Sequence, residues 1–472
     1  MQRREDPGGR SGPTRLLATI LLGIGLSVVL VASACGEATT AGKDKSPRKP
    51  PPAAAPSTSA AQQCGTTSGT GCAPKSERVD LARSTFSDPT NVTNPLFPVS
   101  RQESVLMVGQ VDGKAFRTEV TLLPETRIIE WQGRRVETLV SQYAAYLDGR
   151  IHEVAYDFYA QADDGSVWYF GEDVFNFKDG AIVDTHGTWI AGKDGPAAMI
   201  MPSDPKVGDV YRPENIPGFV FEEVTVKDTR KTLDGPLGPI DGGHVIEELH
   251  MDGTTEDKTF APGYGEFLTA GGGDVEALAL AVPTDALSGP VPAELETLSS
   301  GALGVFDAAR SRDWNAASAR VDKMAGAWDT YRAGEVPRLV EPRMTDALAA
   351  LAEAVDARDA AQAQQAAIGA AWWSLDLQLQ YQPATEIDLA RFDLWAAQLV
   401  ADASAGDAAA VNGDLFTLDY IRDRILHTLP DDDVTRINSA LEELQTAVSD
   451  EDLPAASSAA EHLRGAIGQL KG

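Results

Sequence analysis

The chain has 472 residues, which is too many for one ordinary domain, and we expect two or three. Its 70 acidic residues outnumber its 40 basic ones and give a formal net charge of −30. Such a charge repels phosphate groups, so nucleic acid and an anionic lipid surface are not expected partners. The same charge favours solubility and a loose attraction of divalent cations.

The N-terminus has the pattern of a secretory signal peptide. Four arginines precede an uncharged, mostly aliphatic run over 16–31, which is short for a membrane span of about 20 apolar residues. Because Ala32 and Ala34 stand just before Cys35, the segment resembles the lipobox of bacterial lipoproteins, whose cysteine is lipidated. The resemblance implies that residues 1–34 are removed. Acyl chains would then hold the rest of the protein on the extracytoplasmic face of the cell membrane. An uncleaved anchor helix is the alternative.

Residues 35–78 are expected to form a disordered tether between the membrane and the first domain. Proline, alanine and serine dominate its first part, and such a composition buries too little apolar surface to offset the entropy lost on ordering. Cys64 and Cys72 lie near its end, and in an oxidising compartment we predict a disulfide between them. A metal site is disfavoured there because no histidine or third cysteine lies nearby.

Residues 79–283 are predicted to form an antiparallel β domain, either a sandwich or a barrel-like unit. Short β-branched and aromatic runs alternate with turn residues, and a two-residue turn that ends in glycine predicts a hairpin. Such pairs occur at 112–113, 132–133, 148–149 and 179–180. We predict a loop over 199–213. Further strands are predicted at 219–226, 244–250 and 258–260, and a closing segment at 261–268.

Several motifs of this domain resemble segments of uncharacterised secreted or lipid-anchored proteins of actinobacteria. The motifs are TNPLFP at 93–98, DFYAQ at 157–161, VWYFGED at 167–173, the segment 201–209 and APGYG at 261–265. The resemblance covers residues 88–270. It implies a fold and a location, and it brings neither an activity nor catalytic residues.

An aromatic and acidic block over 157–189 is the candidate ligand-binding site. Its members are Asp157, Trp168, Tyr169, Glu172, Asp173, His186 and Trp189. Core packing explains most of the rings, and a groove for a small apolar ligand is the alternative, because curled sheets often open such mouths. The carboxylates could also serve a hydrolase. Since the sequence contains no GxSxG, HExxH or Walker motif, we do not expect an enzyme and assign no catalytic residue.

Four of the six histidines lie in this domain beside acidic residues. His244 and His250 are six residues apart, so they would share one face of a strand. They could bind a transition metal or serve in acid–base chemistry. Their spacing is looser than that of metal motifs, so we favour solvated histidines and predict neither a metal nor another cofactor.

Residues 291–472 have helical periodicity and a fourfold repeat, which predict an all-α domain. An Asp preceded by Arg, Gly or Glu recurs at 312–313, 358–359, 406–407 and 451–452, and each Asp suits a helix N-cap. Eight helices follow, as two four-helix bundles or one short stack. Their predicted ranges are 293–311, 313–333, 339–357, 359–381, 384–405, 407–428, 431–449 and 452–470. Residues 313–328 loosely resemble helical-bundle domains of bacterial membrane-associated proteins without assigned activity.

Acidic residues gather on both sides of a turn at Pro383. Asp376 precedes the turn, and three further acids follow it, namely Glu386, Asp388 and Asp393. They could converge as in metal–carboxylate bundles, but the required Glu-x-x-His pair is absent from the sequence, so we expect caps and dipole partners. Ion pairing of the segment 419–427 with Asp388 or Asp393 is also expected.

These features favour a membrane-anchored binding or interaction protein. The β domain would take a ligand, and the helical domain would contact another extracytoplasmic protein. An extracytoplasmic hydrolase and a metal-handling lipoprotein are the alternatives.

Overall fold

The computed structural model of the chain describes residues 64–66 and 71–470. The predicted signal peptide, Cys35 and most of the predicted tether lie outside the described residues. Cys64 and Cys72 are joined by a disulfide, with their Cα atoms 4.6 Å apart. Within the described part of the chain, no helix combines the length and the apolar character that crossing a membrane requires.

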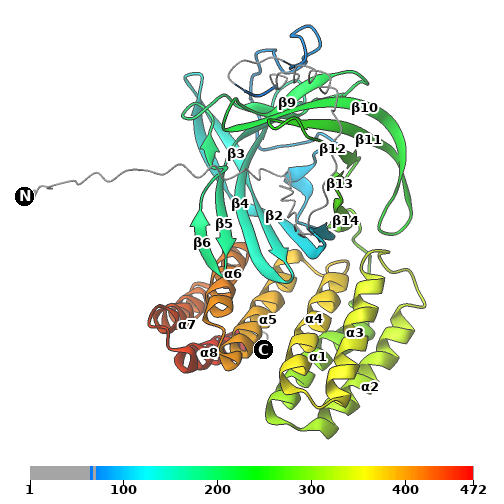
Figure 1. Cartoon of the computed structure of the whole chain (residues 1–472), viewed down its shortest axis with the longest axis vertical. Helices are drawn as coiled ribbons and strands as arrows, with labels where there is room; N and C mark the ends of the chain where they lie inside the picture. Colours follow the sequence, from blue (N-terminus) through cyan, green and yellow to red (C-terminus); the bar gives the residue numbers. More distant parts are fainter. Residues whose placement is uncertain (1–63, 67–70, 471–472) are drawn as a thin grey trace, which may run out of the picture.

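The first domain is one antiparallel sheet of fourteen strands in the described residues, which confirms the predicted β domain. A single sheet curls on itself, whereas a sandwich would need two (Figure 1). The neighbours along it are β6-β5-β4-β3-β2-β1-β14-β13-β12-β11-β10-β9. Strand β8 pairs with β5 and packs against β9, so it brings the two ends of the sheet together.

The strands have the following bounds: β1 Ser104–Val111, β2 Lys114–Trp131, β3 Arg134–Leu147, β4 Arg150–Gln161, β5 Val167–Lys178, β6 Ala181–Asp184, β7 Trp189–Ile190, β8 Ala198–Met201, β9 Val210–Ile216, β10 Val220–Asp234, β11 Pro239–His250, β12 Thr255–Ala261, β13 Gly265–Gly271 and β14 Asp274–Val282. Strands β8 and β9 occupy the ends of the predicted loop over 199–213, so that prediction is wrong at both ends. Strand β14 was not predicted at all.

The glycine-containing turns form hairpins as predicted. In the first, Asp112 and Gly113 have φ values of 51° and 72°, and the other three turns repeat this left-handed pair. Two consecutive positive φ angles define the turn whose twist matches antiparallel strands. The strands between the turns are long: β2 runs past Pro124, where the register with β3 shifts between Leu122 and Thr126. A proline without a donor is accommodated at such an irregularity.

The second domain contains eight α-helices, as predicted: α1 Ala293–Ser311, α2 Trp314–Tyr331, α3 Glu341–Asp356, α4 Ala360–Gln378, α5 Ala384–Ala405, α6 Ala408–Ile425, α7 Asp431–Ser449 and α8 Leu453–Leu470. Helices α1–α4 pack in one group and α5–α8 in another, with α4 beside α5 (Figure 1). The arrangement is therefore two four-helix bundles. At each repeat the predicted Asp caps the following helix; Asp313, for example, accepts from the Ala316 amide at 3.1 Å.

The sheet and both bundles share one hydrophobic core. Tyr146 of β3 stacks on Trp395 of α5 at a centroid distance of 5.4 Å, and Trp372 of α4 contacts the Tyr146 ring edge-on. At the β5–β6 turn, Asn412 of α6 donates a hydrogen bond to the Gly180 carbonyl oxygen at 2.7 Å. The helices therefore cover one outer side of the curled sheet, as Figure 1 shows.

Candidate functional site

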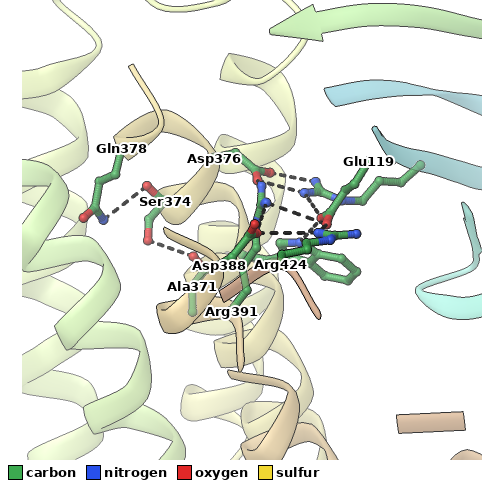
Figure 2. Close-up of polar contacts among 10 residues, drawn as sticks. Glu119, Ala371, Ser374, Asp376, Gln378, Asp388, Arg391 and Arg424 are labelled. Atoms are coloured by element: carbon green, nitrogen blue, oxygen red, sulfur yellow. Dashed lines mark hydrogen bonds and ion pairs between the residues drawn. The ribbon is translucent and has the colours of Figure 1, made fainter. Parts of the chain in front are cut away.

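Six charged side chains meet at the boundary between the two domains. Arg117 and Glu119 come from β2, and the other four come from the helices: Asp376 from α4, Asp388 and Arg391 from α5, and Arg424 from α6. All six are buried, with at most 7% of each residue exposed. Figure 2 shows how Glu119, Asp376 and Asp388 face the guanidinium groups. Three acids and three arginines balance in charge.

The distances in this cluster are those of direct ion pairs. Arg117 lies 2.7 Å from Asp376 and 2.8 Å from Glu119. Arg391 bridges Asp376 at 2.7 Å and Asp388 at 2.9 Å. Burial opposes the ionisation of Glu119, but the neighbouring guanidinium groups outweigh it and hold the pKa of Glu119 well below its ordinary value.

Two of the acids near Pro383, Asp376 and Asp388, belong to this cluster. Asp376 and Asp388 do converge, as the metal–carboxylate alternative required, but arginine side chains fill the space between them. The predicted ion pair between the 419–427 segment and Asp388 is confirmed, since Arg424 lies 3.5 Å from that carboxylate. Asp393 instead faces Arg464 at 3.2 Å. The cluster joins the two domains through buried ion pairs.

The candidate ligand site is a cavity inside the curled sheet, with a volume of about 110 Å³. Eight strands each contribute one charged side chain to its lining: Asp157 (β4), Glu172 (β5), Glu214 (β9), Glu222 (β10), Glu248 (β11), Lys258 (β12), Glu266 (β13) and Glu276 (β14). Six aromatic rings complete the wall: Phe97, Tyr143, Tyr159, Tyr169, Phe260 and Tyr264. Seven carboxyl groups thus surround one ammonium group.

Three of the seven residues proposed from the sequence line this cavity. Asp157 and Glu172 lie opposite each other on β4 and β5, and the Tyr169 hydroxyl donates to Asp157 Oδ1 at 2.6 Å. Trp189 is fully buried and meets the Tyr169 ring edge-on at 5.4 Å. Trp189 therefore packs against a residue of the cavity wall without lining the cavity itself.

The other three residues of the block do not line this cavity. Trp168 donates to Ser166 Oγ at 2.8 Å and packs with Trp131. Asp173 forms an ion pair with Arg127 at 2.6 Å, and 38% of its side chain is exposed. His186 lies against Phe219, with ring centroids 5.4 Å apart. The structure therefore divides the block between the cavity and separate packing contacts.

Burial sets the protonation of the cavity carboxyl groups. It raises the pKa of Asp157 and of Glu214 to about 7 each, although the Tyr169 hydroxyl partly offsets this at Asp157. Burial and the neighbouring Glu214 raise the pKa of Glu172 well above its ordinary value. Glu248 differs: despite burial its pKa is lowered, because the Lys258 ammonium lies 2.7 Å away. Near neutral pH, protons therefore neutralise part of the cavity's negative charge.

Sequence reasoning missed every charged lining residue from β9 to β14. The sequence of β12 contains a pattern that could have indicated such residues. Lys258 and Phe260 alternate with Asp257 and Thr259, so a charged side chain lies on the same face of the strand as a buried ring. Charges at the inward positions of a strand depart from the usual rule that inward positions are apolar. Which face is inward, however, depends on long-range closure of the sheet.

A scan against protein-family models gives no match for this chain, and a search of curated proteins gives none either.

Proposed function

We propose that this protein is a lipid-anchored, extracytoplasmic binding protein whose β domain takes up a small organic cation. One observation carries the proposal: seven carboxyl groups and six aromatic rings line a single cavity. Carboxylates form charge-assisted hydrogen bonds with an ammonium group, and aromatic faces attract its positive charge. The same lining disfavours the small apolar ligand that the sequence left as an alternative, because carboxyl groups would then lose hydrogen bonds without compensation.

The volume of the cavity limits the size of the ligand. A cavity of about 150 Å³ can hold one benzene molecule, and this one measures about 110 Å³. A short alkylamine fits this range. Its arrival would favour ionisation of Asp157, because a nearby cation stabilises the carboxylate.

The anchoring part of the proposal rests on the N-terminal sequence. A basic flank, a short apolar run and small residues before Cys35 support lipidation at that cysteine. The helical domain then supports the sheet from outside, because the buried ion cluster fixes Glu119 on β2, next to the cavity-lining Val120. We propose that its outer surface contacts an extracytoplasmic partner protein.

Calorimetric titration of the purified full chain tests the ligand class. Propylamine is expected to bind saturably, whereas propanol, of similar size but neutral, is expected not to bind. Asp157→Asn should weaken propylamine binding about tenfold, since a hydrogen bond to a charged group contributes about 1.5–3 kcal/mol. Glu130→Gln, on the exposed end of β2, is the matched control and should bind as the unchanged protein does. Equal affinity for propylamine and propanol would show the proposal to be wrong.

A further inference from the structure

We infer that Glu222, Glu248 and His250 form a site for one divalent transition-metal ion. Glu222 lies on β10, and the other two residues lie two positions apart on β11, so both face the same side of the strand. Each offers one ligand atom, and these atoms lie within 4.8 Å of one another. Zinc holds its nitrogen and oxygen ligands at about 2.0–2.2 Å, so small side-chain rotations complete the site.

Unsatisfied buried atoms at this place point to a missing cation. Among the described residues, Glu248 Oε1, Glu256 Oε1 and His250 Nε2 have no hydrogen-bond partner. Glu248 is 1% exposed and Glu256 is 7% exposed. Buried polar atoms are ordinarily satisfied, and two carboxylate oxygens cannot satisfy each other without a proton or a metal ion between them.

The ring nitrogens of His250 lie close to two carboxylates. Its Nδ1 lies 3.9 Å from Glu222 and its Nε2 lies 3.8 Å from Glu256. Both distances are too long for hydrogen bonds. A cation between the ring and the carboxylates would give these atoms a direct partner.

When all acids are ionised, the surroundings of the site carry an excess of negative charge. Glu222, Glu248 and Glu256 carry three negative charges, and Lys258 supplies one positive charge at 2.7 Å from Glu248 Oε2. A bound divalent ion would offset this excess of negative charge.

The types of ligand limit which metal ions could bind at this site. One imidazole with carboxylates suits zinc and its divalent first-row neighbours, whereas calcium and magnesium prefer oxygen ligands alone. Glu222 and Glu248 also line the cavity, so the bound ion would face its interior. The inference stands on these three residues and does not depend on the organic cation proposed above.

Zinc titration of the purified full chain, without amine, tests the site. We expect one Zn²⁺ ion per chain and no comparable binding of Ca²⁺. His250→Gln should weaken Zn²⁺ binding at least about tenfold. His244→Gln is the matched control, because it removes a histidine from the same strand whose Nδ1 lies 3.0 Å from the Gly242 carbonyl oxygen, and it should bind Zn²⁺ unchanged. Equal Zn²⁺ affinity in the unchanged protein and in His250→Gln would overturn the inference.

Two further measurements keep the test decisive. Glu248→Gln should also weaken Zn²⁺ binding, and unchanged affinity in this variant would overturn the inference. If His250→Gln fails to fold, X-ray absorption of the zinc-loaded unchanged chain replaces it, and a spectrum without an imidazole ligand would count against the site. Amine binding that fails while zinc binds would refute only the proposed function.

Discussion

Glu119 of β2 accepts a hydrogen bond from Arg424 of α6 at 2.8 Å, although 305 residues separate the two in the chain. Both side chains are buried, and both belong to the cluster of three acids and three arginines between the domains. Burying a charge without a partner is costly, so each member depends on the others. The β domain and the helical bundles are therefore coupled through charge as well as through their shared apolar core.

Removing the central acid of this cluster should destabilise the whole chain. Glu119→Gln leaves three arginines facing only two carboxylates in a buried space. We expect the free energy of unfolding to fall by about 3–5 kcal/mol, the usual cost of breaking a buried ion pair from one side. Urea denaturation followed by circular dichroism measures it. Glu125→Gln, at an exposed position of the same strand, should change stability by less than about 0.5 kcal/mol. Equal stability of the two variants would contradict this account.

Stability should fall as the pH rises toward 8, because of buried carboxyl groups. Burial raises the pKa of Glu153 to about 8, with added repulsion from Asp157. In the unfolded chain a glutamate has a pKa of about 4.3. Between these two values the folded chain binds more protons than the unfolded chain, so the free energy of unfolding decreases with rising pH.

Thermal denaturation at pH 5.5 and at pH 8 checks this. The midpoint should be higher at pH 5.5, and the advantage of Glu153→Gln over the unchanged protein should be larger at pH 8 than at pH 5.5, because Gln removes this ionisation. Between pH 5.5 and pH 8, Glu153→Gln should lose less stability than the unchanged protein, which serves as the internal control. A higher midpoint at pH 8 for the unchanged protein would mean that these carboxyl groups are not buried as described.

The secondary structure follows from local patterns, which is why it could be predicted. Asp-Gly pairs place two left-handed residues at hairpin turns, and the repeated Asp caps mark where helices begin. Both signals act over a few residues. The helix count and the short connections allowed two bundles or one stack, and the packing of α1–α4 and of α5–α8 decides between them.

The cavity could not be predicted in the same way, because its charged residues come from strands that meet only through long-range pairing. Strand β1 pairs with β14, and Ser104 lies opposite Val282. That pairing brings Glu276 to the wall that also holds Asp157. Prolines and glycines around 202–208 give β8 and β9 a loop-like sequence, so the strand that closes the sheet was also missed.

Lipid attachment at Cys35 predicts a clear fractionation result. Cys35→Ala removes the thiol that would carry the acyl group, so the protein should move from the membrane fraction to the soluble fraction or accumulate unprocessed. Immunoblotting of both fractions, with Cys64→Ala as a cysteine-removal control, measures this. A variant that stays membrane-bound with its first 34 residues attached would instead indicate an uncleaved anchor helix.

The turns before the Asp caps allow a paired test of backbone strain. Arg358 and Gly406 occupy equivalent positions of the repeat, with φ values of 56° and 79°, both in the left-handed region. A side chain there costs roughly 1–2 kcal/mol, a cost that glycine avoids. Arg358→Gly should therefore stabilise the chain by up to about 1 kcal/mol, since glycine's larger unfolded-state entropy offsets part of the gain. Gly406→Ala should destabilise it by about 1 kcal/mol, although its added Cβ meets no atom within 4 Å. Urea midpoints of both variants give the comparison. Effects of the same sign would show that packing, and not backbone conformation, governs these turns.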